Sequence, residues 1–218
     1  MTFKKLSGPL FFRTISVCLA TVSLVLPAHA DYVWLERDAT GTVSAYLGDL
    51  EKGYQSVAGL VPPRLFLADG KDLALETQGE RFVVPVVGSG TSSTGDLRLV
   101  TSRVTDKKVL NYYQARFGRT ETKAVNDLEI VPTTPKGDTF KLLWKGSTVA
   151  ATQVNVDTSE GWRRVLKSAK DGTVSFDPTF PGLYVLEVTA KVNGSVTVDG
   201  KKYDDVRHTA TLSFEVVR

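Results

Sequence analysis

The sequence predicts an all-β protein, and two features support that prediction. Short runs of alternating apolar and polar residues recur along the chain, and turn-forming pairs such as Asp69-Gly70, Asp171-Gly172 and Asn193-Gly194 separate many of them. Alternation with a period of two places successive side chains on opposite faces of a strand, and residues that tolerate a positive φ let the chain reverse. We therefore expect two small β-sandwich-like domains with at most one short helix.

The expected strands can be followed along the chain by this alternation. They are YVWLE (32–36), TVSAYL (42–47), RFVVPVV (81–87), DLRLVTS (96–102), TFKLLW (139–144), TVSF (173–176), LYVLEVTAKV (183–192), SVTV (195–198) and TATLSFEVV (209–217). The segment 196–198 lies between Asn193-Gly194 and Asp199-Gly200, so it predicts one arm of a small hairpin.

Two segments differ from this pattern. Residues 106–118 place Val109, Tyr112, Tyr113 and Phe117 at spacings near three and four, which is compatible with one short helix or with an extended aromatic segment. The composition of GSGTSSTGD (88–96) predicts a flexible loop. It is not a phosphate-binding loop, because the lysine that follows a fixed glycine spacing in that motif is missing.

The first thirty residues are typical of a cleavable secretory signal peptide. They carry Lys4, Lys5 and Arg13 and no acidic residue, followed by the apolar run TISVCLATVSLVL. That run is shorter than the ~20 residues that a membrane-spanning helix needs. We expect a periplasmic protein with no stable membrane insertion after cleavage.

Two cleavage sites are compatible with the sequence, and they decide the fate of His29. Cleavage after Ala28-His29-Ala30 makes Asp31 the first residue, and its small residues fit the export pattern better. Cleavage after Leu26-Pro27-Ala28 leaves His29 at the new amino terminus. There its amine and imidazole would offer two ligands to one metal ion.

The charge balance disfavours nucleic acid as a partner. The chain has 27 basic and 24 acidic residues, and three of the basic ones lie in the leader, so the rest of the chain has equal numbers of both. Nucleic acids and anionic membranes require a concentrated basic face. The single cysteine, Cys18, also lies in the leader, so the mature fold needs no disulfide.

A domain boundary is predicted near residues 120–127, between an irregular first part and a regular strand series. We expect an N-terminal β-rich domain over residues 31–122 and a C-terminal sandwich over residues 123–218. Each has ~90 residues, which suffices for an independent sandwich.

Several segments of the chain resemble a known family. LEIVP (128–132), KGDTFKLLWKGSTVAATQVNV (136–156), DGTVSFDPTFPGLYVLEVTA (171–190) and RHTATLSFEV (207–216) look like the periplasmic domain-of-unknown-function family historically labelled NikM-like. The second half is also similar to the immunoglobulin-like or transthyretin-like sandwich of carboxypeptidase regulatory domains. The resemblance implies a part in nickel or cobalt uptake beside an envelope transporter or receptor component.

The metal ligands that the residues themselves offer are few. The best local group is YDDVRH, in which Asp204 and His208 would share one strand face while Asp205 points to the opposite face. Nickel or cobalt sites usually contain several nitrogen or sulfur donors. The candidate metal ligands are therefore His208, Asp204 and, where the leader is cut early, His29; the alternative for Asp204 and His208 is a solvated surface pair.

Binding is a better expectation than catalysis. No G-x-S-x-G turn or zinc-protease motif is present, and no pair of acids is singled out for sugar hydrolysis. Trp162 follows Gly161 in a polar stretch and is the candidate for stacking on a ligand. We expect a non-enzymatic, monomeric accessory protein in transition-metal or metal-chelate uptake, or alternatively a module that docks another envelope protein.

Overall fold

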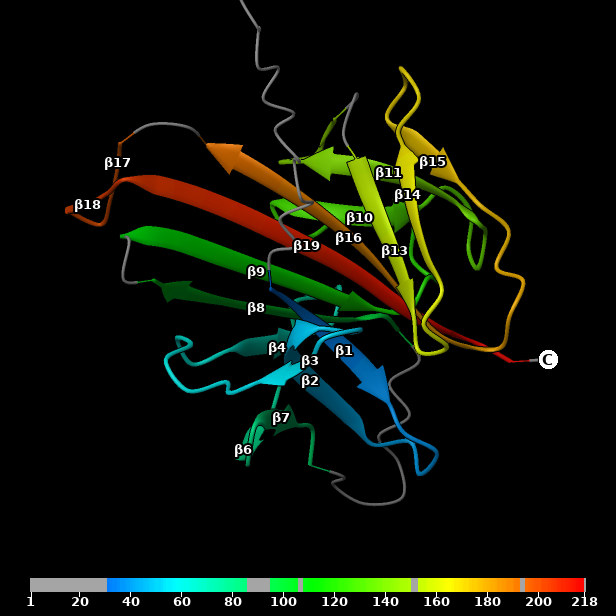
Figure 1. The fold of residues 1–218 in the computed structure, drawn as a ribbon, viewed down its shortest axis with the longest axis horizontal. Helices are drawn as coiled ribbons and strands as arrows, with labels where there is room; N and C mark the ends of the chain where they lie inside the picture. The colour runs from blue at the N-terminus through cyan, green and yellow to red at the C-terminus, as the bar shows by residue number, and fades with distance from the viewer. Residues whose placement is uncertain (1–30, 86–94, 106–107, 150–152, 193–194, 218) are drawn as a thin grey trace, which may run out of the picture.

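A computed structural model describes residues 31–85, 95–105, 108–149, 153–192 and 195–217, and in these residues all regular structure is β-strand. The predicted all-β class is thereby confirmed. His29 and most of the glycine-rich segment 88–96 lie outside the described residues. The strands form one large central sheet, two smaller sheets and a separate hairpin (Figure 1).

The central sheet has eight strands that come from both ends of the chain. In spatial order these are β14 (Arg163–Lys167), β13 (Gln153–Thr158), β16 (Gly182–Val192), β19 (Asp205–Val216), β9 (Val109–Phe117), β8 (Leu97–Val104), β4 (Arg64–Phe66) and β5 (Asp72–Leu73). All neighbouring strands are antiparallel except β19 and β9, which run parallel from the pair Asp205 and Val109 to the pair Ser213 and Phe117.

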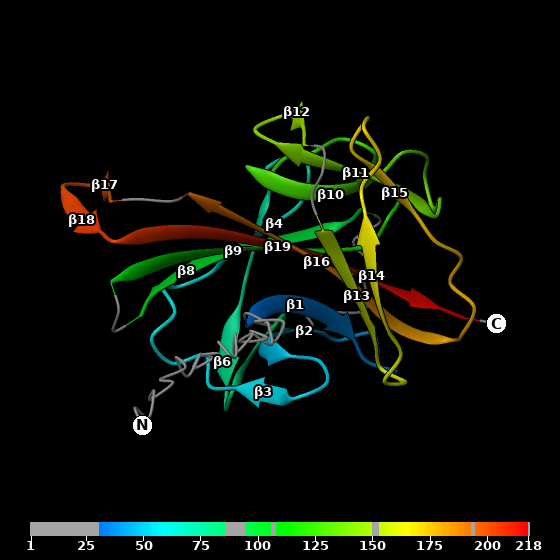
Figure 2. The same ribbon diagram turned by 45° about the horizontal axis from the view of Figure 1, so that its top comes forward.

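The parallel pair joins the two parts of the chain that the sequence separates. The predicted boundary between residues 122 and 123 falls between β9 and β10, and the central sheet continues across it. Residues 31–122 add one small sheet of their own, and residues 123–218 add another. Figure 2 shows these two small sheets on either side of the central one.

The first small sheet, here called sheet A, covers one face of β9 and β8. It contains β1 (Tyr32–Arg37), β2 (Val43–Asp49), β3 (Gly53–Gln55), β6 (Glu76–Gln78) and β7 (Arg81–Val83). Its inner side chains pack against Leu99, Tyr113, Ala115 and Phe117 of the central sheet. Two carbonyl groups of β1 are also bonded by hydroxyls of β19: Thr211 donates to Val33 and Ser213 to Leu35.

The second small sheet, sheet C, covers the opposite face at the other end. It contains β10 (Leu128–Pro132), β11 (Thr139–Trp144), β12 (Ser147–Thr148) and β15 (Thr173–Ser175). Ile130, Phe140 and Leu142 pack against Val156, Leu186, Leu212 and further apolar side chains of the central sheet. Each such fully buried side chain stabilises the fold by about 1.5–3 kcal/mol.

The segment 106–118 contains no helix in its described part. Residues 109–117 form β9, which is the extended alternative. Tyr113, Ala115 and Phe117 alternate into the core under sheet A, so the period of two prevails over the spacings of three and four. The predicted hairpin arm is confirmed: β17 (Val196–Val198) pairs with β18 (Lys201–Tyr203).

Candidate functional site

The outer face of sheet A carries an unusual group of aromatic rings. Registers place Trp34 of β1 opposite Tyr46 of β2, and Gly48 of β2 opposite both Tyr32 and Tyr54. Since alternate residues share a face, Trp34, Tyr46 and Tyr54 lie on the face of sheet A opposite to the one that packs on β8 and β9. Trp34 on this face also packs with Leu183 and Val185 of β16. We call Trp34, Tyr46, Tyr54 and the adjoining Arg81 the aromatic ledge.

The three rings of the ledge lie nearly parallel. The centroid of Tyr46 is 4.6 Å from that of Tyr54, and both lie 5.5–5.7 Å from Trp34, with interplanar angles of 25–27°. Trp34 is fully buried beneath its neighbours, whereas Tyr54 is 56 % exposed. A large buried ring therefore supports an exposed one, which fixes the exposed face in position.

A pocket of about 420 Å³ lies at the side of the ledge, lined by Tyr46, Tyr54, Gln78, Glu80 and Arg81. The Arg81 guanidinium donates to the Tyr46 hydroxyl over 3.2 Å. The pocket thus combines two aromatic rings with an amide, a carboxylate and a guanidinium. That combination is typical of small-ligand sites, which pair apolar area with a few polar groups.

Glu36 adds a second carboxylate near the ledge. Burial raises its pKa, and the neighbouring Trp34 and Arg81 side chains act in the opposite direction. Burial and the charge of Glu36 raise the pKa of Tyr54, so the Tyr54 hydroxyl remains a hydrogen-bond donor throughout the physiological range.

His208 lies on β19 in a second aromatic group. Its ring stacks on Tyr112 of β9 at 4.8 Å and meets the edge of Trp144 of β11 at 4.6 Å. The Gln114 amide nitrogen is 3.2 Å from Nδ1 of His208, and the Gln114 carbonyl already accepts from the Leu128 N–H. Nδ1 is therefore an acceptor, which leaves the hydrogen on Nε2 of a neutral ring.

The electrostatics agree with a neutral imidazole. Burial lowers the pKa of His208, Lys145 lowers it further, and Asp127 raises it. Asp204 is not one of the two charged groups that shift the pKa of His208. Its backbone N–H donates to the carbonyl of Lys108. Asp205 forms ion pairs with Lys191 and Arg207 instead of approaching the ring.

The candidate metal ligands do not meet in one group within the described part of the chain. No cluster of three or more histidine, cysteine, aspartate or glutamate side chains suited to a metal occurs there. His29, the third candidate, is outside that part. His208 thus offers a single imidazole within an aromatic setting.

Trp162 is placed for packing more than for ligand contact. Its ring lies 6.5 Å from Phe180 and against the core under sheet C. Its backbone N–H donates to the Thr158 hydroxyl and its carbonyl accepts from the Thr158 N–H, which closes the turn between β13 and β14. The side chain is partly buried.

Strand β14 ends the central sheet and pairs only with β13 among the described strands. Leu166 points into the core, while Val165 is 55 % exposed. Arg164 and Lys167 are also exposed, and neither forms an ion pair with another described residue. The edge therefore offers backbone groups beside one apolar and two basic side chains.

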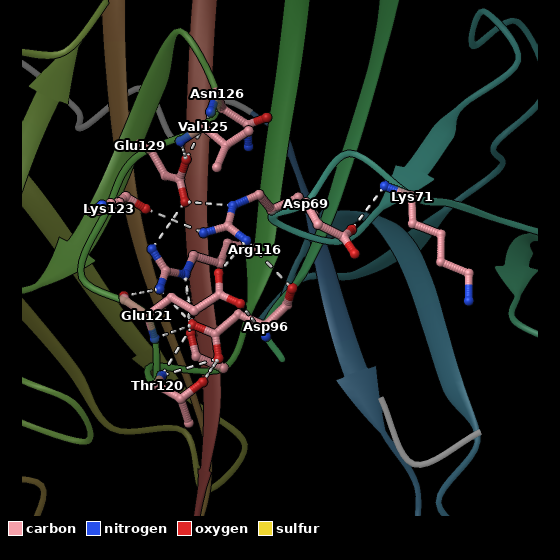
Figure 3. A network of polar contacts seen from close by, with 12 residues as sticks. Asp69, Lys71, Asp96, Arg116, Thr120, Glu121, Lys123, Val125, Asn126 and Glu129 are labelled. Carbon is pink, nitrogen blue, oxygen red and sulfur yellow. Dashed lines mark hydrogen bonds and ion pairs between the residues drawn. The ribbon is translucent and has the colours of Figure 1, made fainter. Parts of the chain in front are cut away.

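The most strongly charged cluster is buried and serves the fold. Arg98 of β8 and Arg116 of β9 both donate to Oε1 of Glu129, over 3.0 and 2.9 Å (Figure 3). Arg116 also pairs with Asp96, and Arg98 with Glu121. Oε2 of Glu129 accepts from two backbone N–H groups, so this oxygen has no room for a ligand.

Sequence reasoning did not find the aromatic ledge. Trp34, Tyr46 and Tyr54 are separated along the chain, and only the pairing of β1, β2 and β3 brings them together. The alternation in YVWLE places Trp34 on the same strand face as Tyr32, but it does not indicate which face the rest of the protein covers.

Neither the profiles of known protein families nor the curated proteins gave a match to this sequence.

No helix in the described residues could cross a membrane.

Proposed function

We propose that the chain is an exported, non-catalytic docking module of the cell envelope, which binds an extended segment of a partner along β14. The observation that carries the proposal is the position of β14 at the end of the eight-stranded sheet, where its outer edge pairs with no other described strand. An added strand would form backbone hydrogen bonds along that edge, as in other cases of β-augmentation.

The side chains of β14 select the kind of segment. Arg164 and Lys167 favour acidic residues in the partner, and the exposed Val165 favours one apolar residue between them. A second copy of β14 fits poorly, because cations would face cations across the new pair. The favoured occupant is an acidic, extended segment of another envelope protein.

Site-specific photo-crosslinking in intact cells tests this proposal. A photoreactive residue at position 165 is expected to give one dominant adduct whose crosslinked peptide is extended and acidic. Position 61 is the matched control, since Val61 is exposed to a similar extent, 54 %, but lies outside β14. Equal adducts from both positions, or adducts with a second copy of the chain, would contradict the proposal.

A second candidate function is an accessory role in uptake of nickel or cobalt, with the metal bound as a chelate. The specific observation in its favour is His208, whose ring is flanked by Tyr112 and Trp144. Ligation through Nε2 would move the ring hydrogen to Nδ1 and would require the Gln114 amide to release that nitrogen. One imidazole can complete the coordination of a metal that a chelator already holds. The adjacent rings supply flat apolar area for the chelator.

Calorimetric titration of the mature protein distinguishes binding of a metal chelate from binding of the bare metal ion. The amino terminus is first fixed by mass spectrometry, because a retained His29 adds an amine and an imidazole. The chelate hypothesis expects binding of a nickel or cobalt chelate that His208→Ala abolishes. Binding of the bare ion alone, or a chelate affinity unchanged by His208→Ala, would count against it.

A further inference from the structure

We propose that the aromatic ledge is a saccharide-binding site, at which Tyr54 and Tyr46 stack on a pyranose ring and the pocket beside them bonds its hydroxyls. The site lies on sheet A and is separate from β14 and from His208. It therefore goes beyond the docking function, and its outcome does not depend on that function.

The exposed ring of Tyr54 is the first element of the argument. A pyranose presents a face of C–H groups, and an aromatic ring recognises such a face through apolar contact. Tyr54 is 56 % exposed on the surface yet held from below by Trp34, which is fully buried. Because its position is fixed before a ligand arrives, little side-chain entropy is lost on binding.

Gly48 helps to hold Tyr54 in its position. The side of Gly48 that would carry a Cβ faces the carbonyl of Gly53, so only glycine allows β3 to approach β2 here. Its φ of 143° is also one that other residues rarely adopt. This close approach brings Tyr54 against Trp34 and Tyr46.

The polar groups of the pocket are the second, independent element. Gln78, Glu80 and Arg81 line its wall and supply both donors and acceptors, as sugar hydroxyls require. Arg81 is oriented by its hydrogen bond to the Tyr46 hydroxyl and lies 6.0 Å above the Tyr46 ring. The volume of about 420 Å³ is within the range of small-ligand sites.

The mixed charge of the pocket indicates a neutral sugar. Arg81 and Glu80 both line the pocket and the charge of Arg81 also acts on Glu36, so neither a strongly anionic nor a strongly cationic ligand is favoured. Hexoses and N-acetylhexosamines have the required ring face and hydroxyls without a net charge. We therefore expect a neutral hexose or N-acetylhexosamine as the ligand.

Titration with soluble oligosaccharides tests the proposal. Chitohexaose, cellohexaose and maltohexaose are added to the mature protein up to millimolar concentration, and binding is followed by calorimetry and by tryptophan fluorescence. At least one is expected to bind and to change the emission of Trp34. Tyr54→Ala should weaken that binding about tenfold, whereas Tyr54→Phe should retain most of it, because the ring and not the hydroxyl makes the stack.

Two controls and one further variant accompany the titration. Phe180→Ala removes an aromatic side chain that is 45 % exposed but lies outside the ledge, so it should leave binding unchanged. Arg81→Gln should weaken binding without unfolding the protein, as measured by thermal denaturation. A nickel chelate without a sugar ring should not compete.

Absence of binding to all three oligosaccharides would overturn the proposal. So would equal loss of binding in Tyr54→Ala and Phe180→Ala, or displacement of the sugar by the chelate. None of these outcomes bears on the docking function, whose readout is the crosslink at position 165.

Discussion

The Tyr32 hydroxyl donates a hydrogen bond to Oδ2 of Asp157 over 3.1 Å and accepts one from the backbone N–H of Leu50. This bond ties β1 to β13 across 125 positions of sequence. Burial raises the pKa of Asp157 to about 6, with Asp49 and Glu187 acting in the same direction. Burial and Asp157 together raise the pKa of Tyr32 so far that it stays a donor.

The raised pKa of Asp157 predicts that the protein is more stable in mild acid. Ionisation of Asp157 disfavours the folded state, and this penalty is relieved as the pH falls through about 6 toward the unfolded value near 4. The free energy of unfolding should rise by about 1.3 kcal/mol between neutral pH and about pH 5, and the full gain of about 3 kcal/mol is reached only below the unfolded value near 4. Urea denaturation at a series of pH values measures it.

Asp157→Asn serves as the control for the pH dependence, because it removes the titrating group. It also ends the ion pair of Asp157 with Arg163, so the two proteins are compared by how their stability changes with pH and not by its absolute value. The stability of Asp157→Asn should vary less with pH than that of the wild type over the same window. Burial also raises the pKa of Glu187, so a smaller rise should remain. A wild-type stability that is flat or decreases from neutral pH to about pH 5 would contradict this account.

Glu129→Gln should destabilise the fold strongly. The substitution removes the charge that Arg98 and Arg116 share, and both guanidinium groups are fully buried. Breaking a buried ion pair in this way costs about 3–5 kcal/mol. Chemical denaturation checks the value, and circular dichroism checks that the strands persist.

Asp72→Asn is the matched control for that measurement. Asp72 pairs with Arg64 at 2.7 Å, but both side chains are more than half exposed. Exposed pairs contribute about 0–1 kcal/mol. A loss in Glu129→Gln no larger than that in Asp72→Asn would show that the buried network does not hold β8, β9 and β10 together.

Gly48→Ala should destabilise the protein and displace Tyr54. An alanine would be strained by the positive φ and would also meet the Gly53 carbonyl. Strained backbone positions of this kind cost about 1–3 kcal/mol. Gly41→Ala is the comparison, since Gly41 has a positive φ of 86° but open space around it. Equal loss of melting temperature in both variants would exclude the contact with Gly53 as a cause.

His208 should be neutral at pH 7, with its hydrogen on Nε2. Nitrogen NMR of the imidazole is expected to show this tautomer and a pKa below the ordinary value. Gln114→Glu should raise that pKa, because a carboxylate can accept a hydrogen from Nδ1 where the amide cannot. An Nδ1–H tautomer in the wild type would contradict the hydrogen bond drawn from Gln114.

The sequence allowed the strands to be predicted better than their partners. Alternation located β1, β8, β11, β16 and β19, although β1 and β16 bury apolar side chains on both faces. The parallel pairing of β19 with β9 joins residues about a hundred positions apart, and alternation within a strand carries no information about such a partner. The aromatic ledge depends on three registers at once, so it could not be foreseen from Trp34 alone.

The predictions of site residues also lacked information about contacts between residues that are distant in sequence. His208 is surrounded by Tyr112, Gln114 and Trp144, none of which is near it in sequence. Strand parity predicts that Asp204 shares a face with His208, but β19 begins only at Asp205. The isolated position of Trp162 after Gly161 suggested exposure, but the turn folds its ring onto Phe180.

Amide hydrogen exchange of β14 with the crosslinked partner segment bound tests the docking function most directly. The account predicts slower exchange at Arg163–Lys167 and unchanged exchange at Val43–Asp49 of sheet A. It also predicts that the segment loses affinity when its acidic residues are replaced by lysine. Protection that appears elsewhere and leaves β14 unchanged would contradict the docking function.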